Sequence, residues 1–142
     1  MKDCENRPAR FLLVEDNPDH AELFLQLMVE HHMAHLIHLI SSGDEVLPYL
    51  RRMPPYQAVQ KPDVILLDLK LPGLSGHEIM ELIKADPDLK SIPVVVMTSS
   101  DAARDRERAA KAQANGYLVK PIDFDEFQKT VQDLEEMGFA IH

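Results

Sequence analysis

One stretch decides how the rest of this chain folds: Pro62-Asp63-Val64-Ile65-Leu66-Leu67-Asp68-Leu69-Lys70-Leu71-Pro72-Gly73-Leu74-Ser75-Gly76. Its apolar run from Val64 to Leu67 is too short for a helix and too uniform for a half-exposed strand. Such a run is typical of a strand buried on both faces, as in a parallel sheet. Asp68 follows directly, and ligands of open α/β sheets bind at the carboxyl ends of the strands. Asp68 is therefore the first candidate functional residue.

The second half of this stretch predicts a turn and then a helix. Pro72-Gly73 favours the turn, and Ser75 with Glu78 forms a capping box at the helix start. We expect the helix to extend to Asp86-Pro87. Its apolar residues at helical spacing are expected to face inward, and they are Ile79, Leu82 and Ile83.

Composition and charge narrow the class of protein. The 142 residues suit one domain, and 45% hydrophobic with 27% charged residues is ordinary for a soluble globular protein. The net charge of −9 argues against binding to DNA or to an anionic membrane. No segment approaches the ~20 apolar residues of a membrane span, and no signal peptide core is present. A single cysteine, Cys4, excludes an internal disulfide and favours a cytoplasmic location.

Four more segments are predicted to be strands, and helices follow them in alternation. The expected strands are Arg10 to Glu15, Leu36 to Ile40, Ile92 to Met97 and Tyr117 to Val119. Five strand–helix alternations with short loops predict an α/β fold, a doubly wound five-stranded parallel sheet with helices on both faces. We expect one globular unit of about residues 10–137, preceded by a loose arm of residues 1–9.

The helix starts carry recognisable caps. Asn17 followed by Pro18 opens the first helix. Ser42 and Glu45 predict a capping box for the second, which Pro48 is expected to kink or delay. Asp123 is expected to cap the last helix, whose apolar face is Phe124, Phe127, Val131 and Leu134.

The segment from Asp101 to Asn115 predicts an unusual helix. Its apolar residues are all alanines, namely Ala102, Ala103, Ala109, Ala110, Ala112 and Ala114. Alanine strongly favours a helix but buries little apolar area. We therefore expect this helix to form readily and to dock weakly.

Polar residues of complementary chemistry follow four of the predicted strands. They are Glu15 and Asp16, Asp68, the hydroxyl residues Thr98-Ser99-Ser100, and Lys120. In a parallel sheet these strand ends lie at one edge. Clustered carboxylates repel unless a cation neutralises them, and hard oxygen ligands suit Mg²⁺. A carboxylate beside Mg²⁺, a lysine and a hydroxyl is equipped to receive a phosphoryl group.

These residues resemble a known family, the receiver domains of two-component response regulators. The resemblance covers residues 10 to about 137 and is carried by four motifs: Val14-Glu15-Asp16-Asn17, Leu67-Asp68-Leu69-Lys70-Leu71-Pro72-Gly73, Met97-Thr98-Ser99 and Lys120-Pro121. It implies a flavodoxin-like sheet with strand order 2-1-3-4-5 and five helices. Glu15 stands where aspartate is commoner in the family, and it is still an oxygen ligand.

The resemblance also implies a role for each site residue. Asp68 accepts the phosphoryl group, while Asp16 binds Mg²⁺ directly, Glu15 mainly through water and Lys70 by its carbonyl. Thr98, Ser99 and Lys120 hold or respond to the phosphoryl oxygens, and Tyr117 is the switch aromatic. The Lys120–Pro121 bond is expected to be cis.

The implied function is that of a stand-alone response regulator, not an enzyme, which signals by changing partner binding or dimerisation. Its expected donor is a sensor histidine kinase, and phrases such as Ile83-Lys84-Ala85-Asp86-Pro87 resemble regulators paired with phytochrome-type kinases. A homodimer is expected to use the face of residues 101–137. No room for an output domain follows His142 if the chain is full length.

Three other functions stay open. A relay intermediate would pass phosphate to a phosphotransfer histidine. An aspartate-nucleophile phosphatase would carry a second acid at the position of Lys70. A scaffold independent of phosphorylation would not need so complete a site.

Zinc binding by histidines is disfavoured. His31 and His35 are suitably spaced only on one continuous helix, which is expected to end between them. We expect His31, His32, His35 and His38 to be surface or strand residues, and His77 to decorate a helix start.

Overall fold

The computed structural model describes residues 9–31 and 36–139. Its centre is one sheet of five parallel strands in the order β2-β1-β3-β4-β5. The strands are β1 (Arg10–Val14), β2 (Leu36–Ile40), β3 (Val64–Leu67), β4 (Val94–Thr98) and β5 (Gly116–Val119). This order confirms the doubly wound fold that the sequence predicts.

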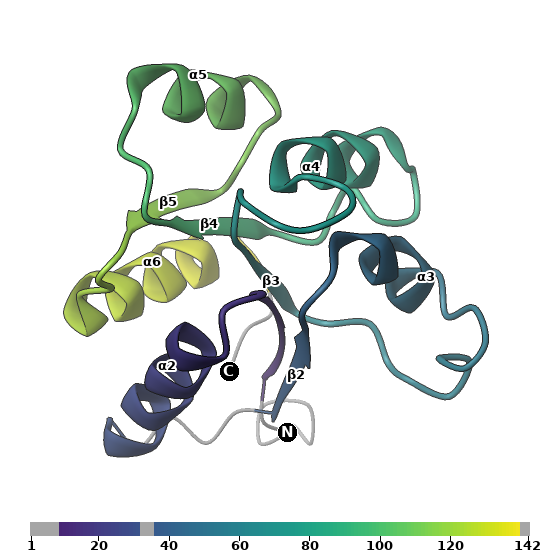
Figure 1. The fold of residues 1–142 in the computed structure, drawn as a ribbon, viewed down its shortest axis with the longest axis horizontal. Coiled ribbons are helices and arrows are strands. Elements are labelled where there is room, and N and C mark those ends of the chain that lie inside the picture. The colour runs from purple at the N-terminus through teal and green to yellow at the C-terminus, as the bar shows by residue number, and fades with distance from the viewer. Residues whose placement is uncertain (1–8, 32–35, 140–142) are drawn as a thin grey trace.

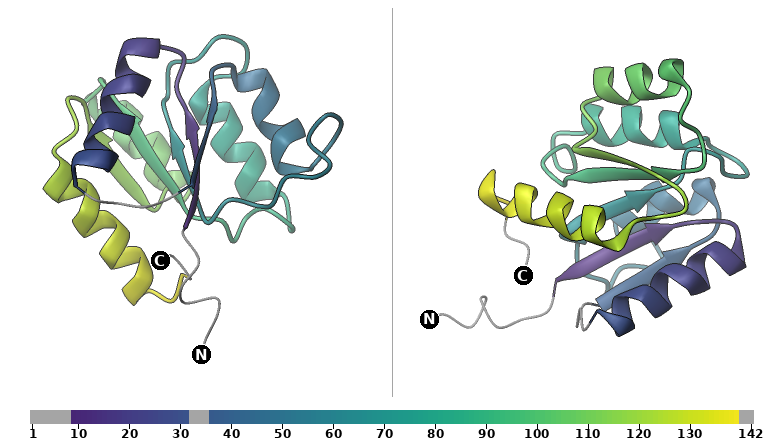
Figure 2. Two further views of the ribbon diagram at one scale, coloured as in Figure 1. Left: turned by 90° about the horizontal axis from the view of Figure 1, so that it is seen from below. Right: turned by 90° about the vertical axis from the view of Figure 1, so that its left-hand side faces the viewer.

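Helices cover both faces of the sheet (Figures 1 and 2). One face is covered by α2 (Pro18–Glu30) and α6 (Phe124–Glu136). The other face is covered by α3 (Val46–Leu50), α4 (Gly76–Ala85) and α5 (Ala103–Lys111). Each face has its own apolar core, because the side chains of a strand alternate between the two sides.

The three inner strands place the site. All residues of β3 and β4 are buried, as the apolar runs of residues 64–67 and 94–97 predict. In the pairing of β1 with β3, Val14 lies opposite Leu67. The residues after these two strands, Glu15 and Asp68, therefore leave the sheet side by side.

The second helix starts late, as Pro48 predicts, but without the expected capping box. A 3-10 turn, η1 (Gly43–Glu45), precedes α3, and the Ser42 side chain accepts a hydrogen bond from the N–H of Asp44. The Glu45 carboxylate instead accepts a hydrogen bond of 3.0 Å from the Tyr56 hydroxyl. The loop that carries Tyr56 thus removes the acid from the helix start.

The prediction that Leu82 of α4 faces the core is wrong. Ser75 and Glu78 form the expected capping box, but Leu82 is 42% exposed. The buried stripe of α4 consists of Gly76, His77, Ile79, Met80 and Ile83. The helix is therefore rotated so that His77 and Met80 face inward where Leu82 was expected.

The N-terminal arm needs a correction at its last residue. Ala9 is fully buried, and its carbonyl accepts a hydrogen bond of 2.9 Å from the N–H of Leu36. The packed region therefore begins one residue before the predicted start. The rest of the expected arm, with Cys4, lies outside the described residues, as do His32 and His35.

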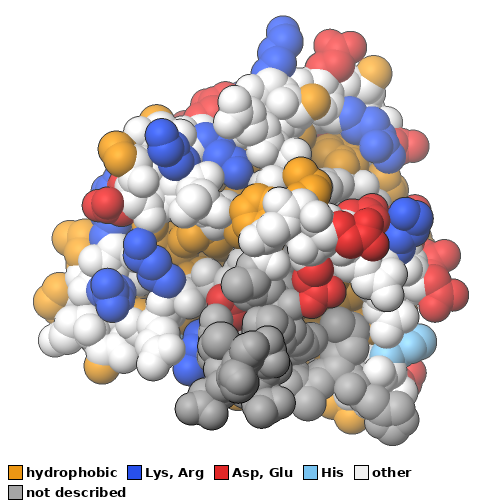
Figure 3. Space-filling model, turned by 180° about the vertical axis from the view of Figure 1, so that it is seen from behind, with side chains coloured by type: hydrophobic (Ala, Val, Ile, Leu, Met, Phe, Trp, Pro, Cys, Tyr) orange, Lys and Arg blue, Asp and Glu red, His pale blue; other side chains and the backbone are white. Residues whose placement is uncertain are grey.

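The surface carries both signs of charge. On the face shown in Figure 3, basic and acidic side chains are interspersed, with hydrophobic side chains between them. Within residues 9–31 and 36–139, no helix combines the length and the apolar character needed to cross a bilayer.

Candidate functional site

Three carboxylates meet where β1 and β3 end. Glu15, Asp16 and Asp68 each offer one carboxylate oxygen, and these three oxygens lie within 4.8 Å of one another. Glu15 and Asp68 are buried, whereas Asp16 is exposed. The structure thus brings together the three acids that the sequence singles out.

The loop after β3 holds Asp68 in place. The N–H of Lys70 donates a 3.0 Å hydrogen bond to Oδ1 of Asp68, and the N–H of Gly76 donates to the carbonyl of Leu69. A Cβ atom at Gly76 would lie 2.3 Å from the carbonyl oxygen of Asp68. Only glycine permits this close approach of the α4 start to the strand end.

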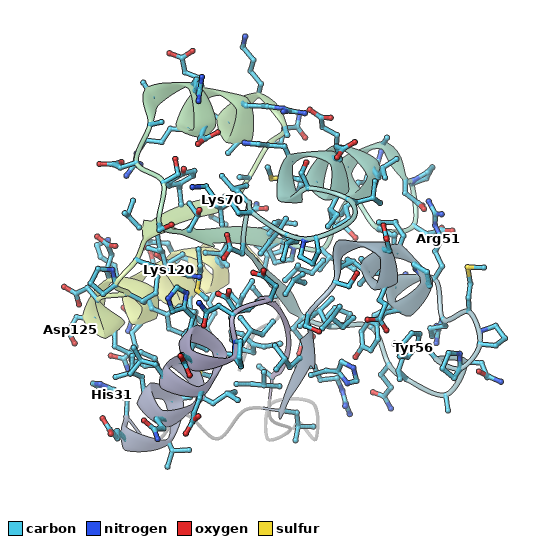
Figure 4. The ribbon with its side chains drawn as sticks, viewed as in Figure 1. His31, Arg51, Tyr56, Lys70, Lys120 and Asp125 are labelled. Atoms are coloured by element: carbon cyan, nitrogen blue, oxygen red, sulfur yellow. The ribbon has the colours of Figure 1, made fainter. Side chains whose placement is uncertain are left out.

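Lys120 joins the cluster from the end of β5 (Figure 4). Its Nζ lies 2.9 Å from Oδ2 of Asp68 and also forms an ion pair with Oε1 of Glu15. The imidazole Nδ1 of His20 lies 3.1 Å from the same Nζ, and no sequence motif predicts this neighbour. The Lys120–Pro121 bond that follows is cis.

Burial and hydrogen bonding shift the pKa values of Glu15 and Lys120 in opposite directions. Burial raises the pKa of Glu15, although hydrogen bonds from Lys120 and from the N–H of Asn17 act against it. Burial alone would lower the pKa of Lys120, but its hydrogen bonds to Glu15 and Asp68 outweigh burial and raise it. Lys120 therefore remains a cation while it faces two acids.

The end of β4 supplies the hydroxyl groups. Thr98 is fully buried, and its Oγ1 accepts a 3.3 Å hydrogen bond from the N–H of Ser100. Ser99 is exposed and lines a groove beside Lys120. The Tyr117 hydroxyl donates a 2.8 Å hydrogen bond to the carbonyl of Ser100, and the guanidinium of Arg106 lies 4.6 Å from the Tyr117 ring centre.

His77 is buried, contrary to its predicted place on the surface of a helix start. It is 8% exposed, and its Nε2 lies 3.1 Å from Oδ1 of Asp105 in the first turn of α5. Its Nδ1 is buried without a hydrogen-bond partner among residues 9–31 and 36–139. The spacing within α4 alone does not reveal this role, because the partner comes from α5.

Two other histidines, His31 and His38, pack on aromatic rings. His31, at the end of α2, stacks on Phe124 with ring centres 4.4 Å apart, beside the start of α6 (Figure 4). His38 on β2 lies 4.6 Å from the ring of Tyr49. Both contacts fit the structural roles expected for these residues.

A largely apolar groove opens beside the site, between α2 and the start of α6. Its volume is about 300 Å³. Three of its lining residues, Glu15, His20 and Lys120, belong to the site. The remaining lining residues are Leu13, Leu23, Phe24, Leu27, Met97, Ser99, Pro121 and Ile122.

The donor set of the site fits a hard divalent cation. It offers carboxylate oxygens from three residues, two of them buried and one exposed. Such oxygen ligands, with room for water on the exposed side, are typical of Mg²⁺ sites. Two of the acids already pair with the Lys120 ammonium, which shows that the cluster attracts positive charge.

The chain belongs to the family of response regulator receiver domains, which matches residues 11–132. The probable methanogenesis regulatory protein FilR2 of Methanothrix harundinacea is 37% identical over 129 residues, covering 91% of this chain and 83% of FilR2. The response regulator Rcp1 of Synechocystis sp. is 34% identical over 135 residues, covering 95% of this chain and 92% of Rcp1. The resemblance seen in the motifs is thereby confirmed.

Solved structures agree with the fold. The bacteriophytochrome response regulator AtBRR is similar with a TM-score of 0.82 and 37% identity, covering 91% of this chain and 94% of AtBRR. The Mn²⁺-bound form of Rcp1 has a TM-score of 0.77 and 32% identity, covering 93% of this chain and 95% of Rcp1. Receiver domains bind Mg²⁺ or Mn²⁺ at an acidic pocket, and the cluster of three acids corresponds to it. They are generally signal transducers rather than enzymes.

Proposed function

We propose that this chain is a response regulator that accepts a phosphoryl group on Asp68 from the phosphohistidine of a sensor histidine kinase. One observation carries the proposal: Asp68 directly follows the central strand and belongs to the acidic cluster, with its Oδ2 2.9 Å from the Lys120 ammonium. The similarity to a bacteriophytochrome response regulator supports a phytochrome-type kinase as the donor.

The proposed reaction is a transfer between two nucleophiles. A carboxylate oxygen of Asp68 attacks phosphorus, so that an O–P bond forms while the N–P bond of the phosphohistidine breaks. The electron pair of the broken bond stays on the imidazole nitrogen. The N–H of Lys70 holds Oδ1 of Asp68 at 3.0 Å, which orients the carboxylate for the attack.

Charge on the transferred group is offset by residues around it. The Lys120 ammonium lies 2.9 Å from Oδ2 of Asp68, and we assign it to a phosphoryl oxygen, with Thr98 and Ser99 donating from the end of β4. Glu15, Asp16, Asp68 and the carbonyl of Lys70 would hold Mg²⁺. When bound, this cation adds positive charge beside the phosphoryl oxygens.

Two surfaces would serve partners. The apolar groove beside Glu15 and Lys120 suits an apolar segment of the phosphodonor, because it opens next to the acceptor. The face of residues 101–137 is the proposed output and homodimer surface. Its support is the weak burial of α5, which makes this helix easy to move.

The test is direct labelling of Asp68. The protein is incubated with acetyl phosphate with Mg²⁺ or with EDTA, and the adduct is located by borohydride trapping and mass spectrometry. We expect one adduct, on Asp68, that needs Mg²⁺ and is absent from Asp68→Asn. The control Asp88→Asn removes an exposed acid that does not belong to the cluster, and Asp68 should be labelled in it as in the wild type. Modification at another residue, or labelling of Asp68→Asn, would contradict the proposal.

A further inference from the structure

A chain of polar contacts runs from Thr98 at the site to the buried start of α4. The N–H of Ser100 donates to Oγ1 of Thr98 at 3.3 Å. The hydroxyl of Ser100 donates to Oδ2 of Asp105, in the first turn of α5. The other oxygen of that carboxylate, Oδ1, lies 3.1 Å from Nε2 of His77. Three elements, β4, α5 and α4, are thus joined through single side chains.

The chemistry of these groups fixes the direction of each hydrogen bond. A carboxylate only accepts, so Nε2 of His77 must carry the hydrogen and donate it to Asp105. Because Oγ1 of Thr98 accepts from Ser100, the Thr98 hydroxyl hydrogen is left to donate elsewhere. Hydrogen bonds from Ser100 and His77 lower the pKa of Asp105, so this carboxylate stays charged.

The burial of His77 needs an explanation beyond packing. The residue is 8% exposed, and its Nδ1 finds no partner in the described part of the chain. Leaving a buried polar atom unpaired is unfavourable, and an apolar side chain would fill the same space without that penalty. What the imidazole adds is a donor that reaches Asp105 across the gap between α4 and α5.

We propose that His77 is a positioning residue that holds Ser100 through Asp105. The series of hydrogen bonds from Thr98 to His77 then transmits the phosphorylation state of Asp68 to α5. A shift of Thr98 towards a phosphoryl oxygen pulls on its bond from Ser100, whose side chain is tied to Asp105. The Tyr117 hydroxyl is tied to the same residue, through the Ser100 carbonyl. The inference rests on the proposed function, since it takes Asp68 as the acceptor.

A second contact between α4 and α5 provides a matched control. Arg108 Nε lies 3.3 Å from Oε2 of Glu81, and both side chains are about half exposed. This ion pair joins the same two helices but does not touch Ser100 or Asp105. A variant of Glu81 therefore weakens docking of α5 without cutting the chain to Thr98.

The experiment measures hydrogen exchange of residues 103–111 with and without beryllofluoride and Mg²⁺. In the wild type, we expect the phosphoryl mimic to change the protection of α5. In His77→Leu, we expect exchange of α5 to be about tenfold faster without the mimic, and the response to the mimic to fall by at least about half. Acetyl phosphate should still label Asp68 in this variant.

Three further variants separate transmission from mere docking. His77→Gln retains an N–H donor and should restore the response. Ser100→Ala cuts the chain from the other side and should lose it, which keeps the test valid if His77→Leu folds poorly. Glu81→Gln should loosen α5 slightly and keep the response.

The possible results have separate meanings. A wild type that is neither labelled on Asp68 nor altered by the mimic contradicts the proposed function, and this inference with it. If Asp68 is labelled, an unchanged response in His77→Leu overturns only the inference. A response lost equally in Glu81→Gln, or not restored in His77→Gln, also overturns it, because docking or shape would then account for the effect.

Discussion

Helices α5 and α6 follow one another along the chain and are held to the sheet by opposite means. α6 buries Phe124, Phe127, Val131 and Leu134. In α5 the buried residue is Ala109, and its exposed or partly exposed side chains contribute the Arg108–Glu81 ion pair and the Asp105–His77 contact. Figure 1 shows α6 lying along the sheet and α5 standing farther from it.

Because α6 buries more apolar area than α5, its contacts contribute more to the stability of the fold. Phe127 packs between Phe11 and Phe24, with ring centres 6.1 Å and 5.2 Å away. A buried phenylalanine contributes roughly 2–3 kcal/mol through its apolar area, whereas an exposed ion pair contributes about 0–1 kcal/mol. A helix held by apolar area stays in place, and one held by a few polar contacts is cheap to shift. The movable helix is the one that follows Thr98.

Truncation of the core should show the largest contrast between the two helices. Phe127→Ala should lower the free energy of unfolding by about 3–5 kcal/mol, because it leaves a cavity between two aromatic rings. Ala109→Gly should lower it by about 1–2 kcal/mol, mostly through helix propensity. Urea unfolding measures both. The exposed control Ala110→Gly isolates the propensity effect, and equal losses in α5 and α6 would break the comparison.

The acidic site should produce the next largest effect, and its neighbours Thr98 and Lys120 lie in the segments that precede α5 and α6. At ten times Kd, Mg²⁺ should stabilise the wild type by about 1.4 kcal/mol. In EDTA, Asp68→Asn should melt higher than wild type because one of three clustered negative charges is gone, and it should gain less from Mg²⁺. Lys120→Ala should melt lower in EDTA, because Glu15 and Asp68 both lose their cation.

Thermal melts of these three proteins, each in EDTA and in Mg²⁺, check this expectation. The result that contradicts it is an Asp68→Asn protein less stable than wild type in EDTA together with no Mg²⁺ effect on either. The three acids would then not share one site.

The smallest effect concerns pH. Hydrogen bonds from Ser100 and His77 hold the pKa of Asp105 below its ordinary value of 3.8. Its stabilisation is therefore complete above that value and is lost as the pH falls through the lowered pKa of the folded state. Because Asp105 is partly exposed, the stabilisation is at most about 1 kcal/mol.

Urea unfolding of Asp105→Asn against wild type tests this at two pH values. The variant should be less stable at pH 7, and the difference should shrink as the pH is lowered from 3.8 through the depressed pKa of folded Asp105. Asp133→Asn, an exposed acid on α6 that lies 3.5 Å from Lys129, should show little difference at either pH. If Asp133→Asn in α6 lost as much stability as Asp105→Asn in α5, with the same pH dependence, the two helices would not differ in their electrostatic contacts.

Local sequence signals predict much of this architecture. The caps at Asn17, Ser75 and Asp123 form as expected, because a cap involves residues only two or three positions apart. The apolar runs of β1, β3 and β4 are buried, because a run without polar residues has no exposed face to offer. Such signals do not depend on how distant elements pack.

Helix rotation is where local signals fail. Leu82 matches the apolar spacing of α4 and is 42% exposed, while His77 breaks that spacing and is 8% exposed. Ile79 and Ile83 suit either rotation of the helix. In the observed rotation, His77 contacts Asp105, which lies 28 residues later in the sequence.

Apart from His20, the sequence by itself determined which residues lie at the candidate site. All strands of a parallel sheet run in the same direction. Residues that follow their apolar runs, such as Asp68 and Lys120, must therefore gather at one edge of the sheet. Only the tertiary structure decided the pairings: Lys120 with Glu15, 105 residues away, and His77 with Asp105. Such contacts depend on the rotation of each helix and the path of each loop, and these are set by packing between elements that no local pattern contains.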